Sequence, residues 1–272
     1  MSRLIAGVAL ILFGAGLLGL AGWSALHPVA HYALTLAPVE ADQDSRGFGL
    51  AADAFQRVEI TAPEQRRPIA TGLVAREGER LTPLSWRNEV TDSILFADRP
   101  AADLQKVLAA IGEHAPADAL VFAWWDFSRA IRLIAKRDAP LDDALARGLL
   151  LPASWTEARE AERARWGKGA SPQSSERFTQ FVDALLADEK QGVAALEKMA
   201  GGKQAYLVAH ISDVWKAASL RPDRMPIAYR DFPSSGVSHG VIKSALQWLR
   251  EQKIEGGYAA EPVDGATRLH YF

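Results

Sequence analysis

The pattern of apolar and polar positions opens with an uninterrupted apolar stretch. Leu4 to Leu26 (LIAGVALILFGAGLLGLAGWSAL) contains no charged residue. A helix rises ~1.5 Å per residue, so a stretch of this length crosses the hydrocarbon layer of a bilayer. The pattern therefore predicts a single N-terminal transmembrane helix, with the lipid bilayer as its partner.

The charges beside this stretch predict its orientation. Arg3 is the only charged residue before it, and the positive-inside rule places that residue in the cytoplasm. Residues 1–27 are then a cytoplasmic tip and anchor in a bacterial inner membrane, and the remaining chain lies in the periplasm. A cleaved signal peptide is the alternative, because Ser24, Ala25 and Ala30 are small. The apolar run exceeds the roughly 7–15 residues of a signal's hydrophobic region, which favours an uncleaved anchor.

Residues 28–92 show a less regular pattern. A possible strand at Tyr32–Val39 is followed by polar residues, a second apolar patch and the segment TAPEQRRPIATG (61–72). That segment is rich in residues that interrupt regular structure. We interpret residues 28–92 as a segment close to the anchor that packs on the main domain.

From Ser93 onward, strand-like runs alternate with helical spacing. SILFA (93–97) and Ala119–Trp125 are strand-like and flank a predicted helix at Ala101–Gly112. Another helix follows Asp126, and the polar residues 156–169 predict an exposed helix. The same patterns predict helices after Ser171-Pro172 and within 234–253, a stop at Gly201-Gly202, strands at the start of 204–215 and at 227–232, and a hairpin turn at Asp264-Gly265.

This order of elements predicts an α/β protein. Strands separated by helices favour one three-layer α/β domain at residues 93–272, built on a mixed sheet. The closing hairpin would make one edge of that sheet antiparallel. The whole chain is then a single transmembrane helix followed by this periplasmic domain.

Composition excludes several classes of function. The chain has no cysteine, which excludes disulfides, covalent haem attachment through C-x-x-C-H, thiolate metal sites and thiol catalysis. Its formal net charge is −2, and −3 without Arg3, so no nucleic-acid partner is indicated. A glycine-rich phosphate loop, a G-x-S-x-G elbow and an H-E-x-x-H pair are also missing from the sequence. We expect no cofactor.

The stretch ALVFAWWDFSRAIRLI (119–134) contains the candidate ligand-binding residues. Asp126 stands where the predicted strand becomes a helix, so its carboxylate can serve simply as a helix N-cap. Trp124 and Trp125 can simply fill the core on opposite faces of an extended strand. Open α/β sheets, however, also bind their ligands at the carboxyl ends of strands. Trp124, Trp125 and Asp126 are therefore candidates for binding a ligand there.

A catalytic interpretation needs a second segment. If His210 lies at the end of a neighbouring strand, Asp126 and His210 can form an acid/imidazole pair for proton transfer. Together with Asp213 and His239, the same groups have the chemistry to hold a divalent metal. The spacing matches no recognised motif, so we predict no metal site and name Asp126 and His210 only as catalytic candidates.

A local resemblance concerns the Trp-Trp-Asp segment. ALVFAWWDFSRAIRLIAKRDAPLDD (119–143) resembles the strand–WWD–helix segment of the oligosaccharyltransferase catalytic subunits, whose motif continues Tyr-Gly. This chain continues with Phe127-Ser128 and has one predicted membrane span instead of many. The resemblance therefore implies a shared way of building a strand-to-helix junction, and not glycosyl transfer.

Over most of its length, the chain resembles the hydroxylamine oxidation protein family of HaoB type. The resemblance rests on the single N-terminal anchor, the size of the outside domain, and the stretches DALVFAWWDFSRAIRLIAKR (118–137) and LDDALARGLLLPASW (141–155). Members of this family are anchored proteins encoded beside the multihaem hydroxylamine oxidoreductase of nitrifying and methane-oxidising bacteria. The resemblance implies a pathway and a compartment, and it brings no assigned catalytic residues.

Two hypotheses follow for the function. The leading one is a membrane-anchored periplasmic accessory protein that docks, or helps mature, a periplasmic multihaem redox enzyme such as hydroxylamine oxidoreductase. The alternative is an anchored periplasmic enzyme or small-ligand receptor that uses the strand ends around Trp125, Asp126 and His210. An open pocket at Asp126 with His210 in hydrogen-bond reach would favour the alternative.

Overall fold

The computed structural model describes most of the chain beyond the predicted anchor. The described residues are 32–39, 43–63, 67–90, 93–142, 149–151, 155, 159–166, 172–225, 228–234, 239–254, 257–263 and 265–271. Leu4–Leu26 lies outside them. Within them, no helix is both long enough and apolar enough to cross a membrane. The transmembrane helix therefore stays a prediction.

The N-terminal part forms a four-stranded antiparallel sheet in the order β1-β2-β3-β4. The predicted strand at Tyr32–Val39 is present as β1, whereas the next three strands were not predicted. Gly78 has a φ of 59° in the β3–β4 turn, a conformation that glycine adopts without strain. The elements of this part are β1 (Ala33–Pro38), α2 (Gln43–Arg46), the 3-10 turn η1 (Ala52–Ala54), β2 (Phe55–Thr61), β3 (Ala70–Glu77) and β4 (Arg80–Asn88).

The two faces of this sheet pack against different parts of the protein. One face buries Val58 and Trp86 in a cluster with residues from the centre of the chain. The other face buries Leu73 against α3 (Ala101–His114), which turns Leu104 and Leu108 toward it. The helix predicted at Ala101–Gly112 is thus confirmed, and its apolar stripe covers part of the sheet.

A parallel pair of short strands lies beside this sheet. β5 (Leu120–Phe122) pairs with β6 (Ala205–Leu207), at the two places where strands were predicted. The chain leaves β5 into α4 (Trp125–Ala130) and a π-helical turn, η2 (Ile131–Ala135). Further helices precede and follow β6: α5 (Arg159–Trp166), α6 (Pro172–Leu185), α7 (Glu189–Ala200) and α8 (Asp213–Leu220). Gly201 ends α7 with a φ of 61°, as the predicted stop requires.

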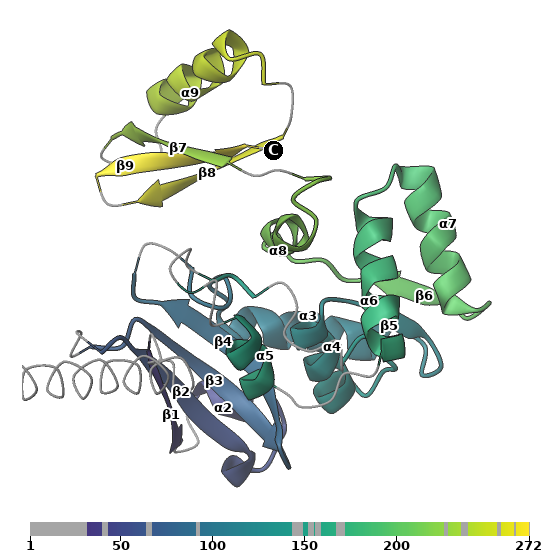
Figure 1. Ribbon diagram of the computed structural model, residues 1–272. Helices are drawn as coiled ribbons and strands as arrows, with labels where there is room; N and C mark the ends of the chain where they lie inside the picture. Colours follow the sequence, from purple (N-terminus) through teal and green to yellow (C-terminus); the bar gives the residue numbers. More distant parts are fainter. Residues whose placement is uncertain are drawn as a thin grey trace, which may run out of the picture.

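The C-terminal residues form a small unit with its own core. β7 (Ala228–Pro233), β9 (Ala266–Tyr271) and β8 (Tyr258–Val263) make an antiparallel sheet in that order. α9 (His239–Glu251) covers one face through Ala245 and Leu249. Figure 1 shows this unit beyond α8. The pairing of β8 with β9 confirms the predicted hairpin.

The α/β class is confirmed, but the arrangement of the sheets differs from the prediction. The described strands form three separate sheets, two antiparallel and one parallel, instead of one mixed sheet. SILFA forms no strand, because Leu95 has a positive φ of 66° and makes only an isolated bridge to Leu150. The polar helix near 156–169 is present as α5, yet it buries Glu162 and Trp166 rather than lying fully exposed.

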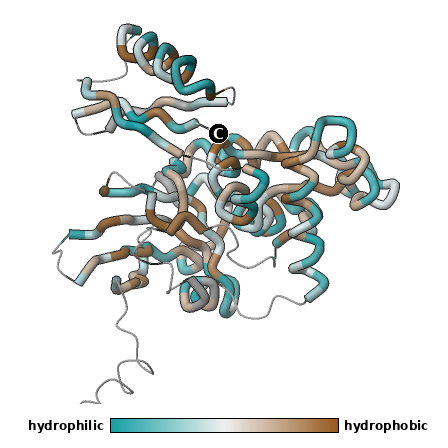
Figure 2. The backbone as a smooth tube through the Cα atoms, turned by 45° about the horizontal axis from the view of Figure 1, so that its top comes forward, coloured by the Kyte–Doolittle hydropathy of each residue, from teal (hydrophilic) through white to brown (hydrophobic). Residues whose placement is uncertain are grey.

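Trp124 and Trp125 both lie in the core, each 1% exposed. The Trp124 ring contacts Phe178 of α6 edge to face, with centroids 5.1 Å apart. The Trp125 ring lies near Phe96 and Trp166, at 5.8 and 6.4 Å. In Figure 2, apolar segments (brown) run through the N-terminal sheet and the helices beside it. The two rings therefore join different elements to one core.

We predict that Trp124→Ala and Trp125→Ala each lower the free energy of unfolding by ~3–5 kcal/mol, because each leaves a large cavity. Denaturant unfolding of the full-length protein in detergent measures the change. Val193→Ala is the control, since Val193 is 51% exposed on α7 and its truncation should cost no more than about 0.5 kcal/mol. Unchanged unfolding of both tryptophan variants would contradict the prediction.

Candidate functional site

Asp126 lies inside α4, not at its cap. Trp124 occupies the N-cap position, and the helix begins at Trp125. The N-cap interpretation of Asp126 is therefore wrong, because β5 ends at Phe122 and the helix starts earlier than the sequence suggested. Asp126 stands in the first turn, where the helix dipole favours a negative charge. Its side chain is 1% exposed.

Two cations from distant parts of the chain bracket the Asp126 carboxylate. Arg99 donates from Nη1 to Oδ2 at 2.9 Å. The Nζ atom of Lys216 lies 3.6 Å from Oδ1. Arg99 is 5% exposed and Lys216 2% exposed. Because all three charges are removed from water, each compensates part of the desolvation cost of the others.

Further contacts extend this cluster to the sheet and to α8. Arg99 also donates from Nη2 to the carbonyl oxygen of Pro83 in β4, at 2.9 Å. Lys216 Nζ is 3.1 Å from Oδ1 of Asp213. We call Arg99, Asp126, Lys216 and Asp213 the buried ion network. It contains two positive and two negative side chains, so its charges balance.

Each of the two cations lies against an aromatic ring. The Arg99 guanidinium lies 4.5 Å from the centroid of the Phe127 ring. Lys216 Nζ lies 5.5 Å from that of Trp124. Such contacts attract a cation to the face of the ring. Trp124 is thus placed beside the network as well as in the core.

His210 lies next to the network without pairing with Asp126. Its Nδ1 is 2.8 Å from Oγ of Ser212, and its ring stacks on Phe127 with centroids 5.9 Å apart. Asp213 accepts the backbone N–H of His210 at 2.9 Å, so this carboxylate binds the backbone and not the ring. In the described part of the chain, no hydrogen bond or ion pair joins the side chains of Asp126 and His210.

The local charges set the protonation of both groups. Burial alone would raise the pKa of Asp126, but the charges of Lys216 and Arg99 and the hydrogen bond from Arg99 outweigh it. The pKa of Asp126 therefore lies below its usual value. Burial and the charge of Lys216 lower the pKa of His210, against the opposing effect of Asp213. Asp126 is thus ionised and His210 neutral near pH 7, without a contact for proton transfer.

The residues considered for a metal do not gather. Asp213 is bound to Lys216, and Asp126 faces two cations. His239 begins α9 in the C-terminal unit (Figure 1). Among the described residues, no group of three or more His, Asp or Glu side chains could hold a metal ion.

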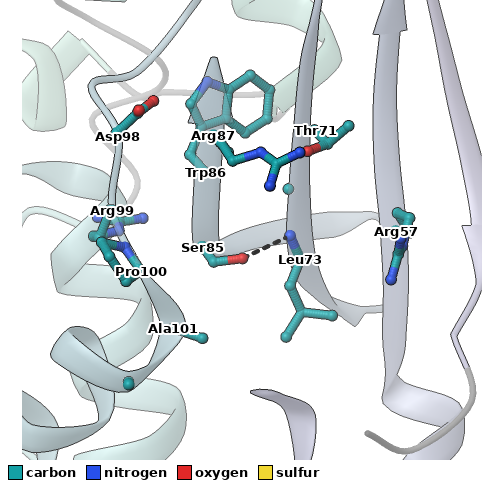
Figure 3. Close-up of a pocket in the computed structure, with 12 residues that line it drawn as sticks. Arg57, Thr71, Leu73, Ser85, Trp86, Arg87, Asp98, Arg99, Pro100 and Ala101 are labelled. Atoms are coloured by element: carbon teal, nitrogen blue, oxygen red, sulfur yellow. Dashed lines mark hydrogen bonds between the residues drawn. The ribbon is translucent and has the colours of Figure 1, made fainter. Parts of the chain in front are cut away.

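A hollow of about 440 Å³ lies beside the start of α3. Strands β2, β3 and β4 and residues 98–102 form its walls (Figure 3). Arg57, Arg87 and Arg99 are among the lining residues. Arg99 therefore belongs both to this hollow and to the buried ion network. The sequence reasoning had not singled out any of these arginines.

The sequence reasoning found Asp126 but missed its cations. Lys216 carries the clearer signal, because it is a charged residue in the otherwise apolar run VWKAA (214–218), one helical turn after Asp213. Arg99 directly precedes the proline at the start of α3 and is separated from Asp126 by 27 positions. No spacing rule connects residues so far apart.

A second buried carboxylate has weaker support. Glu162 of α5 is 2% exposed, and Arg165 Nε is 3.5 Å from its Oε1. Within the described residues, its Oε2 has no hydrogen-bond partner. Burial raises the pKa of Glu162 to about 7, against the opposing charge of Arg165. This side chain therefore titrates near neutral pH.

Fold and site together define an α/β protein whose central charges hold its own elements together. The family model described as HaoA-associated protein HaoB matches residues 1–272. The chain belongs to this family, which is associated with HaoA and with hydroxylamine oxidation. Comparison with curated proteins and comparison with solved structures each gave no match.

We predict that Asp126→Asn lowers the free energy of unfolding by ~3–5 kcal/mol, because two buried cations then share one remaining carboxylate. Denaturant unfolding at neutral pH measures this loss. Asp231→Asn is the matched control in the exposed pair with Arg268, and it should cost less than about 1 kcal/mol. Adding Arg99→Met to Asp126→Asn should restore part of the stability, because the buried Lys216–Asp213 pair then stays balanced. An equal, small loss in Asp126→Asn and Asp231→Asn would contradict the prediction.

The same variant should change the dependence on acid. A lowered folded pKa contributes stability that is present above the unfolded value of 3.8 and is lost as the pH falls through the folded pKa. The difference between wild type and Asp126→Asn should therefore shrink below about pH 4. A difference that stayed constant into stronger acid would show that the charge of Asp126 is not its source.

Glu162→Gln should change the stability near neutral pH, and not in acid. A raised folded pKa of about 7 means that wild-type stability falls as the pH rises from the unfolded value of 4.5 to about 7, and stays lower above it. Glutamine has no charge to bury, so the variant should gain melting temperature relative to wild type between about pH 5 and pH 8. The prediction would be contradicted if the melting temperatures of the two proteins changed with pH in the same way over this range.

Proposed function

We propose that this protein is a membrane-anchored periplasmic accessory protein of hydroxylamine oxidation that docks HaoA or helps it mature. In this proposal, Leu4–Leu26 holds the chain in the bacterial inner membrane. The folded part lies in the periplasm and meets a multihaem redox enzyme there. Membership of the HaoA-associated family and the apolar N-terminal stretch support this assignment.

The environment of Asp126 is the observation that carries the non-catalytic role. Its two carboxylate oxygens face Arg99 and Lys216, and the side chain is 1% exposed. The one acid that the sequence offered for catalysis is therefore used inside the fold. A docking protein needs a surface of fixed shape, and the buried ion network maintains that shape by holding the elements beneath it in place.

Exposed apolar side chains near β6 support a docking surface. Leu207 is 47% exposed and Ile211 66% exposed. Within the described residues, β6 pairs along one edge only, with β5. An unpaired strand edge beside apolar side chains is a feature that partner chains use. We place the HaoA contact at β6 and the turn that follows it.

Co-purification tests the docking role. Tagged full-length protein is extracted in mild detergent from membranes of cells that make HaoA, and HaoA is identified by its peptides. HaoA should be recovered with wild type and with Val107→Asp, a control on the exposed face of α3. Ile211→Asp should reduce its recovery while the melting temperature stays unchanged. Equal recovery with both variants would exclude this surface, and no recovery with wild type would count against docking itself.

A second experiment separates docking from catalysis. Deleting residues 28–272 should impair the accumulation of HaoA or its association with the membrane. Asp126→Asn should keep HaoA activity close to wild type at a temperature where the variant stays folded and abundant. If the folded, abundant variant reproduced the deletion, the accessory role would be abandoned in favour of chemistry at Asp126.

The orientation has its own test. Protease added to intact spheroplasts should digest the folded part of the protein if it lies in the periplasm. A cytoplasmic protein serves as the control for intact membranes. Protection of residues 28–272 under these conditions would overturn the orientation.

A further inference from the structure

The register of the N-terminal sheet determines which side chains line the hollow beside the start of α3. Arg57, Leu73 and Ser85 stand opposite one another on β2, β3 and β4, so they share one face. Thr71 and Arg87 form the next row on that face. α3 covers the apolar part of the face, whereas this part, with its guanidinium and hydroxyl groups, borders the hollow. We call the space the basic hollow.

The size of the basic hollow matches a small molecule. Its volume of about 440 Å³ lies within the roughly 300–1,000 Å³ of ligand pockets. Strands lie about 4.8 Å apart, so Arg57 on β2 is roughly 10 Å from the backbone of β4. Figure 3 shows Arg57 on one side and Pro100 and Ala101 on the other. A ligand that touches both walls must be larger than a single inorganic ion.

The charges around the hollow leave one guanidinium without a partner. Arg87 pairs with Glu89, with 2.6 Å between Nε and Oε1. The Asp98 carboxylate accepts two hydrogen bonds from Asn88, at 2.7 and 2.8 Å. Arg57 makes no hydrogen bond or ion pair to any described residue.

Acidic residues oppose this charge. Asp98 lines the hollow, and its hydrogen bonds from the neutral Asn88 leave its negative charge in place. Asp103 stands in the first turn of α3. Glu59 follows Arg57 by two positions on β2 and therefore stands on the same face, opposite Thr71. It does not line the hollow. Its negative charge should weaken the binding of an anion there, which provides a reciprocal test.

Two further donors lie at the wall opposite Arg57. α3 begins there, and Pro100 at its N-cap position makes no side-chain cap, so the first N–H groups of a 14-residue helix favour an anion. Independently, Arg99 lines this wall and is 95% buried, and its Nε–H has no hydrogen-bond partner among the described residues. A buried donor without an acceptor is costly, and it points to an acceptor that arrives with a ligand.

We propose that the basic hollow binds a small organic anion. Arg57 and the Ser85 hydroxyl hold its phosphate or carboxylate group. At the opposite wall, the Arg99 Nε–H and the first N–H groups of α3 donate to a second oxygen-bearing group of the same ligand. Leu73 and Pro100 contact the apolar part of the ligand. The site does not depend on HaoA docking, because it lies on β2–β4 and α3 and not on β6.

Titration calorimetry on the full-length protein in non-ionic detergent tests this site. Glycerol 3-phosphate probes for a phosphate group, citrate probes for carboxylates, and glycerol is the neutral control. At least one anion should bind saturably, and glycerol should not. Binding of only one of the two identifies the anionic group that the site prefers.

Variants then locate the binding. Arg57→Gln should weaken it about tenfold or more, the effect of losing one charged hydrogen bond, without changing the melting temperature of the free protein, because Arg57 is exposed. Glu59→Gln should tighten it. Arg76→Gln is the matched control, with the same loss of charge at an exposed position outside the hollow. Absence of saturable binding by both anions, or equal affinity in Arg57→Gln and Arg76→Gln, would overturn the proposal.

Discussion

The ion pairs of Asp126 are the constraint on which the rest of the structure depends. Arg99 brings the start of α3 and, through Pro83, strand β4 to this carboxylate, while Lys216 brings α8. Three segments far apart in the sequence thus meet at α4. Buried ion pairs add little stability over apolar packing, yet an unpaired buried charge is very costly. The network therefore disfavours every arrangement in which these elements pack without bringing the charges together.

The sequence predicted those elements whose patterns involve only neighbouring residues. The stripe of α3, the glycine stop after α7 and the closing hairpin depend on residues within a few positions of one another. The pairing of strands does not. β2 places Arg57 and Glu59 between buried positions, so its apolar alternation is short and easily missed. β5 and β6 are three residues each, and no periodicity shows that they pair with each other and not with the N-terminal sheet.

The site was predictable to the same extent. Asp126 was noticeable because it is a single acid after an apolar strand, and the tryptophans before it indicated burial. Its partners come from long-range packing that no spacing encodes, as the separation of Arg99 shows. The distinction between a helix cap and a buried ion pair depended on where α4 begins, and a shift of two residues changed the role of the carboxylate.

Two neighbouring residues of α8 connect the C-terminal unit to the buried ion network. Lys216 is anchored in the ion network, and Trp215 meets the sheet of the C-terminal unit at His270, with ring centroids 5.4 Å apart. The unit has a hydrophobic cluster of its own. α8 therefore contacts both parts of the protein, because one of its residues pairs with the buried charges beside α4 and the next residue along the chain contacts the small sheet.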